Sequence, residues 1–295
     1  MVNIHGIVPA MVTPMNEDET INEKELRAQV NRQIEAGVHG LFCLGTNGEF
    51  YILNQEEKLK VMEIVIHENA GRLPVFVGTG AIGTKETVQL SQKAQELGAD
   101  VLSVITPYFA AASQNEIYEH FKTVANSVDI PILPYNIPMR TGANINVDTL
   151  KRLSQIPNIT GVKDSSGNFD NILQYIESTD DSFAVLSGND SLVLWTLQAG
   201  GKGAICGIAN LFPHTMASIY ELWKAGEFAE AKKVQDSIRE IRNCFKLGNP
   251  NTIVKIATNL LGHPVGPCRK PFYTNSESIR EEIQRVLHTY YKDFK

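Results

Sequence analysis

Several features of membrane, secreted and nucleic-acid-binding proteins are missing from this sequence. No apolar run approaches the roughly 20 residues that a membrane-spanning helix needs. The N-terminal stretch has no basic region followed by a long apolar region, as a secretory signal would have. The formal net charge is −6, and no basic stripe offers a surface for nucleic acid. We therefore expect no membrane and no nucleic-acid partner.

Cysteine is also scarce. The four cysteines, Cys43, Cys206, Cys244 and Cys268, lie far apart and form no C-x-x-C pair. This number and spacing favour buried thiols in a reducing compartment over a disulfide framework. The sequence therefore predicts a cytoplasmic protein.

Most familiar catalytic motifs are absent too. The seven histidines are scattered without an H-E-x-x-H spacing, so we predict no metal site, and neither G-x-S-x-G nor a P-loop occurs. One G-x-G-x-x-G pattern, Gly78 to Gly83, follows a strand-like run and precedes a helical one. Asp100, the acid at a suitable distance, precedes its strand and would lie at the wrong end. A tight turn is the favoured interpretation, and a nucleotide-dependent oxidoreductase stays as a rival.

What the chain does contain is a regular alternation of strand-like and helical segments. The strand-like runs are short and almost continuously hydrophobic, as in parallel strands covered on both faces. They begin at Gly6, Gly40, Pro74, Val101, Pro131, Asn158, Phe183 and Gly203. Helical patterns between them include residues 54–71, with Asn54 as N-cap, and 84–98, ending at Gly98. Eight units predict an α/β fold, a (β/α)8 TIM barrel over residues 1–226, with a doubly wound open sheet as the alternative.

No further strand pattern follows Gly226. Residues 227–245, 251–262 and 277–291 have helical spacing instead. The sequence therefore predicts a second region, residues 227–295, as a C-terminal extension of three helices.

In a barrel of this kind, the active site lies where the strands end. The predicted strand ends supply one lysine, two tyrosines, hydroxyls and small polar groups: Thr13, Gly45 to Glu49, Thr106 to Tyr108, Tyr135, Asn136, Lys163, Asp164, Gly188, Asn189, Ala209 and Asn210. This composition points toward covalent chemistry on an amine.

Lys163 is the main candidate in this set. Burial disfavours the charged form of an amine, and a neutral amine can add to a ketone and form a Schiff base. Tyr135 ends the preceding strand, and its phenol, together with the hydroxyl of Thr46, can carry the protons that imine formation requires. The alternatives are a solvated lysine at the exit of a strand and a tyrosine that only packs its ring.

Two further features suit carboxylates. The turn from Gly45 to Gly48 offers backbone N–H groups, and Arg140 has the planar fork that binds a carboxylate in two places. A surface salt bridge is the alternative role for Arg140. We expect the loops around Tyr108, residues 110–113 and Arg140 to shape the pocket for a second substrate.

These motifs together resemble a known family. "GTNGEF", "TPYF", "YNIPMRTG", "GVKDSSGN" and "GPCRKPF" occur in the order and spacing of the class I pyruvate-dependent lyases, which include dihydrodipicolinate synthase and N-acetylneuraminate lyase. The resemblance spans nearly the whole chain. It implies a TIM barrel, a helical C-terminal part and a homotetramer built as a dimer of dimers. It also implies no metal or organic cofactor, because a lysine does the covalent chemistry on a small-molecule substrate.

The resemblance also implies roles for individual residues. Lys163 is similar to the Schiff-base lysine and Tyr135 to the phenol of the proton relay. Thr46 and Asn47 correspond to the residues that hold the pyruvate carboxylate, and Thr46 belongs to the relay as well. Gly188 and Ile205 would line the pyruvate pocket.

Two departures bear on the substrate. Synthases of this family usually have a second threonine where this chain has Asn47, and a relay tyrosine from the neighbouring subunit where it has Phe109. We therefore favour an aldolase for a 2-oxo acid such as 4-hydroxy-2-oxoglutarate or a 2-keto-3-deoxy sugar acid. The alternative is a synthase that condenses pyruvate with aspartate semialdehyde, whose carboxylate Arg140 would bind. A non-catalytic small-molecule sensor is a third possibility.

Overall fold

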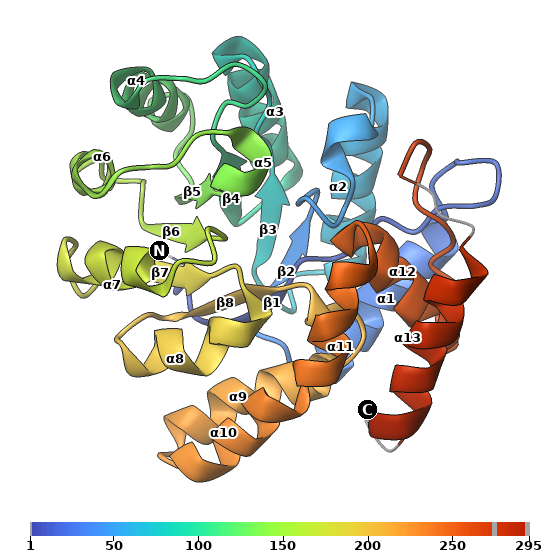
Figure 1. Cartoon of the computed structure of the whole chain (residues 1–295). Coiled ribbons are helices and arrows are strands. Elements are labelled where there is room, and N and C mark those ends of the chain that lie inside the picture. Colours follow the sequence, from blue (N-terminus) through green and yellow to red (C-terminus); the bar gives the residue numbers. More distant parts are fainter. Residues whose placement is uncertain (1, 273–275, 293–295) are drawn as a thin grey trace.

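The computed structural model in Figure 1 describes residues 2–272 and 276–292. Within these residues, eight parallel strands form one sheet in the order β1-β8-β7-β6-β5-β4-β3-β2. A parallel bridge between Ala10 and Phe42 joins the two edges of the sheet. The strands are β1 (Gly6–Pro9), β2 (Leu41–Cys43), β3 (Val75–Gly78), β4 (Val101–Ile105), β5 (Ile132–Asn136), β6 (Gly161–Asp164), β7 (Ala184–Ser187) and β8 (Gly203–Cys206). This arrangement confirms the predicted TIM barrel.

Helices alternate with the strands and cover the outside of the barrel (Figure 1). They are α1 (Glu23–Glu35), α2 (Gln55–Asn69), α3 (Thr84–Leu97), α4 (Gln114–Ala125), α6 (Val147–Leu153), α7 (Phe169–Glu177), α8 (Val193–Gln198) and α9 (Pro213–Lys224), with a short α5 (Pro138–Thr141) after β5. Helix α2 begins with the predicted N-cap. The Asn54 side chain accepts from Glu57 N, and the Glu57 side chain accepts from Asn54 N. Helix α3 ends at Gly98, whose φ of +98° lies in the left-handed region that favours glycine.

The core has separate layers inside and outside the barrel. Successive strand residues point to opposite faces, so alternate residues fill the interior. One buried cluster contains inward residues such as Phe42, Phe76, Leu133, Leu186 and Ile205. The other two clusters lie between the strands and the helices. Side chains therefore fill the interior of the barrel, so a ligand can bind only at its rim.

Packing accounts for two of the three glycines of the G-x-G-x-x-G pattern. A Cβ on Gly78 would lie 2.0 Å from the carbonyl oxygen of Leu44, and one on Gly80 would lie 2.6 Å from Cγ2 of Ile105. The Asp100 carboxylate accepts from Val75 N at 2.8 Å, at the start of β3. The acid therefore lies at the opposite end of the strand from Gly78, as the sequence predicted.

The C-terminal extension is helical, but its first segment is divided. It consists of α10 (Phe228–Ser237), α11 (Arg239–Asn243), the 3-10 turn η4 (Cys244–Leu247), α12 (Pro250–Leu260) and α13 (Glu277–Tyr290). The continuous helix predicted for residues 227–245 is split because the buried Tyr291 hydroxyl enters its hydrogen-bond ladder. This hydroxyl accepts from Ile241 N at 3.0 Å and donates to the Ser237 carbonyl oxygen at 2.7 Å.

Figure 1 shows α11, α12 and α13, coloured orange to red, together on one side of the barrel. The described part of the chain contains no helix that combines the length and the hydrophobicity needed to cross a membrane.

Candidate active site

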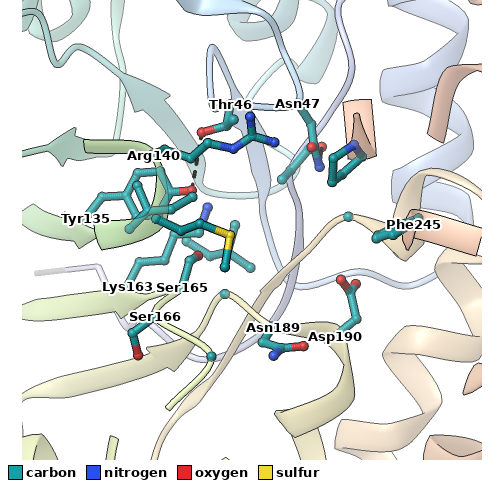
Figure 2. Close-up of a pocket in the computed structure, with 18 of the residues that line it drawn as sticks. Thr46, Asn47, Tyr135, Arg140, Lys163, Ser165, Ser166, Asn189, Asp190 and Phe245 are labelled. Carbon is teal, nitrogen blue, oxygen red and sulfur yellow. Dashed lines mark hydrogen bonds between the residues drawn. The ribbon is translucent and has the colours of Figure 1, made fainter. Parts of the chain in front are cut away.

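A cavity of about 240 Å³ opens at the carboxyl ends of the strands. Its lining includes most of the predicted site residues: Thr46, Asn47, Tyr135, Arg140, Lys163, Gly188 and Ile205. Figure 2 shows Lys163 and Tyr135 close together, with Thr46 and Arg140 above them and Asn189 and Asp190 on the opposite side. Side chains from separate βα loops therefore converge on one small space.

Lys163 lies in the wall of this cavity with little exposure. Its side chain is 3% exposed, and its Nζ lies 3.9 Å from the centroid of the Tyr135 ring and 5.0 Å from that of Phe42. Among residues 2–272 and 276–292, no carboxylate lies within ion-pair distance of this nitrogen. The Lys163 nitrogen is therefore enclosed by aromatic rings and not committed to a salt bridge.

Tyr135 connects Lys163 to the loop after β2. Its hydroxyl lies 3.3 Å from the hydroxyl of Thr46, as the dashed line in Figure 2 shows. Tyr135 is 4% exposed, so its ring is fixed by packing. A threonine hydroxyl, a phenol and an amine thus follow one another along the cavity wall, which is an arrangement that can move protons.

The loop that carries Thr46 and Asn47 is held by the C-terminal extension. Asn251 Nδ2, on α12, donates to the Thr46 carbonyl oxygen at 2.6 Å. Below it, the buried side chains of Glu49 and Lys255 form an ion pair of 2.6 Å. Asn47 Nδ2 makes a long contact of 3.4 Å to the Ala10 carbonyl oxygen. Contacts from α12 therefore set the position of this loop.

A buried carboxylate organises the segment after Lys163. Asp164 Oδ1 accepts from Asn136 Nδ2 at 2.8 Å, and its Oδ2 accepts from Ser166 Oγ at 2.6 Å. Burial raises the pKa of the Asp164 carboxyl above its ordinary value, and these hydrogen bonds oppose the rise. The network fixes the end of β6 and so helps to fix the residue before it, Lys163.

Two predicted site residues do not line the cavity within the described part of the chain. The Gly48 carbonyl oxygen accepts from Thr13 Oγ1 at 2.7 Å, beneath the loop. Tyr108 packs edge-on against Phe50, with 6.1 Å between ring centroids. Its neighbour Phe109 is 95% exposed with a φ of +78°, so in a single chain it is directed at solvent.

Arg140 does line the cavity, from an exposed position on α5. Its Nη2 donates to Asn249 Oδ1 at 3.2 Å, and no carboxylate of the described residues pairs with it. Its guanidinium is therefore available to an anionic ligand.

The sequence argument did not predict the side chains that the C-terminal extension adds to the lining. These residues are Arg242, Phe245, Pro250 and Asn251. A rule that inspects only strand ends cannot find them. Ser165, Ser166 and Asp190, by contrast, directly follow predicted positions, so extending each strand end by two residues would have included them. Within the described residues, no group of three His, Cys, Asp or Glu side chains is arranged to hold a metal ion.

Comparisons with known proteins cover nearly the whole chain. The family model described as "Dihydrodipicolinate synthetase family" matches residues 3–290. A curated relative from Syntrophus aciditrophicus (strain SB), named 4-hydroxy-tetrahydrodipicolinate synthase, is 40% identical over 97% of this chain and 98% of its own length. The crystal structure of dihydrodipicolinate synthase from Aquifex aeolicus superposes with a TM-score of 0.95, at 34% identity, over 99% of this chain and 100% of that one. YagE from E. coli K12, a prophage protein of the same family solved in complex with pyruvate, has a TM-score of 0.94 at 31% identity over 97% of this chain and 98% of its own.

Proposed function

The chain belongs to the dihydrodipicolinate synthetase family, and on that premise we propose that it condenses pyruvate with aspartate semialdehyde through an imine on Lys163. Enzymes of this family are pyruvate-dependent lyases and synthases that use a covalent lysine imine. The chain is therefore an enzyme that makes or breaks a carbon–carbon bond, and neither a sensor nor a nucleotide-dependent oxidoreductase. The names of its relatives favour the synthase, which the sequence argument ranked second, over the aldolase.

The observation that carries the proposal is the environment of Lys163. Its nitrogen is enclosed by the rings of Tyr135 and Phe42, lines the cavity, and is not paired with a carboxylate of the described residues. An amine in such surroundings is suited to attack a ketone.

In the proposed first stage, the Lys163 amine adds to the C2 ketone of pyruvate, whose carboxylate rests on Thr46 and Asn47. The carbinolamine loses its hydroxyl as water and becomes an iminium ion. Tyr135 supplies the proton for that departure, and Thr46, 3.3 Å away, relays it. Tyr135, which has given up its proton, then takes a proton from C3, and the iminium accepts the electrons of that C3–H bond, giving an enamine.

In the second stage, C3 of the enamine forms a bond to the aldehyde carbon. The electron pair of the aldehyde carbonyl moves to its oxygen, which takes a proton from the relay. Water then hydrolyses the regenerated iminium, releasing the product and the Lys163 amine. Arg140, with its unpaired guanidinium, is the proposed contact for the carboxylate of aspartate semialdehyde.

A second candidate, the 2-oxo acid aldolase, is supported by Phe109 and Asn47. Phe109 has no hydroxyl to complete a relay across a subunit interface, and Asn47 replaces the usual second threonine. Aldol cleavage uses the same imine in reverse, so the two candidates differ only in the partner that the cavity accepts.

Borohydride reduction in the presence of pyruvate, followed by peptide mass mapping, tests the shared mechanism. We expect a pyruvate adduct on Lys163, and none in Lys163→Ala. An active protein without that adduct would contradict the mechanism. Aspartate semialdehyde condensation, run beside pyruvate release from a panel of hydroxylated 2-oxo acids, then separates the synthase from the aldolase.

We also propose that the enzyme is a homotetramer in the cytoplasm. Three large apolar side chains on consecutive βα loops, Ile82, Phe109 and Met139, are 52%, 95% and 88% exposed, and a second copy would cover them. All four cysteines are free and buried, which suits a reducing compartment. Sedimentation should show that Phe109→Lys reduces the assembly size, and an unchanged size would contradict this interface.

A further inference from the structure

A second guanidinium group, that of Arg242, lines the cavity together with that of Arg140. It is half-buried and comes from α11, in the C-terminal extension. Among the described lining residues, Asp190 supplies the one carboxylate. The cavity therefore has an excess of positive charge in a protein whose net charge is −6.

The hydrogen-bonding capacity of Arg242 is largely unused. Its Nη2 makes one long contact, 3.4 Å, to Asn189 Oδ1. Its Nε is buried and has no hydrogen-bond partner among the described residues, and no carboxylate there lies within 4.0 Å of the guanidinium. A buried, unsatisfied donor is costly, so an acceptor from a ligand would be stabilised there.

The position of Arg242 is nevertheless defined. Its guanidinium carbon lies 4.8 Å from the centroid of the Phe245 ring, a cation–π contact from the same helical segment. Arg140, by contrast, is exposed and is held by a contact to Asn249. Arg242 is therefore the better preorganised of the two guanidinium groups.

A purely structural role would be to support the buried Asp190. Burial raises the pKa of the Asp190 carboxyl, and the nearby charge of Arg242 opposes that rise. However, Asp190 Oδ1 accepts from Ile208 N at 2.9 Å, so the backbone at the end of β8 already satisfies it. Support of Asp190 leaves the Nε of Arg242 unexplained, and the experiment must separate the two roles.

We propose that Arg242 is a specificity-determining residue that, together with Arg140, binds the distal carboxylate of the aldehyde partner and selects such aldehydes over neutral ones. This inference rests on the proposed function. The Thr46–Asn47 loop accounts for the carboxylate of pyruvate, so the remaining positive charge implies a second carboxylate on the partner. Guanidinium groups bind carboxylates through parallel hydrogen bonds, which gives both affinity and orientation.

A matched pair of four-carbon aldehydes tests the proposal. Succinic semialdehyde ends in a carboxylate where butanal ends in a methyl group. With pyruvate saturating, we would measure kcat/KM for both aldehydes, and for aspartate semialdehyde, in the wild type, Arg242→Gln, Arg242→Lys and Arg140→Gln. Arg239→Gln is the control, because Arg239 is an exposed residue of the same helix outside the cavity lining.

We expect Arg242→Gln to lower kcat/KM for the carboxylate-bearing aldehydes by about 10- to 100-fold and to leave butanal nearly unchanged. Arg242→Lys should recover part of this loss, since it keeps the charge without the planar fork, and Arg239→Gln should match the wild type. A wild type that uses butanal as well as succinic semialdehyde, or that uses neither carboxylate-bearing aldehyde, overturns the proposal. So does a preference that disappears in Arg140→Gln but persists in Arg242→Gln.

Exchange of the pyruvate methyl protons with deuterated water separates this inference from the proposed function. The exchange needs the imine on Lys163 but no aldehyde. Normal exchange in Arg242→Gln with lost selectivity supports the proposal, and lost exchange in that variant overturns it in favour of a structural role. If the wild type itself neither exchanges nor traps pyruvate, the proposed function and this inference both fail.

Discussion

Tyr135 and Lys163 are direct register partners on the neighbouring parallel strands β5 and β6. Their side chains therefore emerge on the same face, and the Lys163 nitrogen lies 3.9 Å from the centre of the phenol ring. The pairing of two strands thus fixes the spacing between the proposed nucleophile and the ring of the proposed proton donor.

The first prediction concerns the hydroxyl of Tyr135. In Tyr135→Phe the buried ring is kept, but the 3.3 Å contact to Thr46 is lost. We expect kcat for condensation to fall by about 10²- to 10⁴-fold, because a proton transfer loses its carrier, with a smaller change in the KM for pyruvate. Steady-state kinetics with varied pyruvate would measure both. Tyr108→Phe is the matched control, since Tyr108 does not line the cavity, and equal losses in the two variants would contradict the relay.

The second prediction concerns the ion pair between Glu49 and Lys255, which are 0% and 1% exposed. Glu49→Gln leaves a lysine charge buried without its partner and should destabilise the protein by about 3–5 kcal/mol. The double variant Glu49→Gln/Lys255→Met should cost less than the sum of the two single changes. Urea unfolding would measure this coupling. The same cycle on the exposed pair Lys93–Glu96 should show almost none, and additivity at the buried pair would refute the prediction.

The third prediction concerns pH. Burial lowers the pKa of His120 from its ordinary 6.5 to about 4. His120 therefore binds a proton below about pH 6.5 in the unfolded chain, but only below about pH 4 in the folded chain. His120 should therefore remove about 3 kcal/mol of stability as the pH falls through that window. In His120→Gln, unfolding free energies should decline less steeply between these pH values. An unaltered slope in His120→Gln would count against the assignment.

The fourth prediction concerns Tyr291, whose hydroxyl separates α10 from α11. Tyr291→Phe leaves the N–H of Ile241 and the carbonyl of Ser237 without this bridge. We expect a loss of about 1–3 kcal/mol in the free energy of unfolding. Tyr290→Phe, at a neighbouring side chain that is 49% exposed, is the control. Equal stability of Tyr291→Phe and the wild type would show that the bridge contributes nothing.

The barrel and its central residues were predictable because their signals are local. Continuous hydrophobic runs mark buried parallel strands, and the residue that ends such a run faces the catalytic rim. Lys163 and Tyr135 are the penultimate residues of β6 and β5, and Thr46 follows the end of β2 by three positions. The split between α10 and α11 was not predictable, because its cause is a hydroxyl 50 residues away from Ile241 in the sequence.

The contribution of the C-terminal extension to the cavity was hidden for a related reason. Helical periodicity shows which face of a helix is buried, but not which other element covers that face. From the sequence pattern, Arg242 is therefore indistinguishable from any other polar residue of an amphipathic helix. Only the docking of α11 and α12 against the barrel rim gives it a place in the cavity that Lys163 also lines.

The hydrogen bond from Asn251 to the Thr46 carbonyl joins residues 205 positions apart in the chain. During synthesis at about 5–20 residues per second, Thr46 therefore waits roughly 10–40 s for the residue that holds its loop. Lys163 and Tyr135, the proposed catalytic residues, also emerge well before α12 does. A nascent barrel thus has the proposed nucleophile before the loop of Thr46 is held in place, and we expect competence for the reaction to begin only after α12 has left the ribosome.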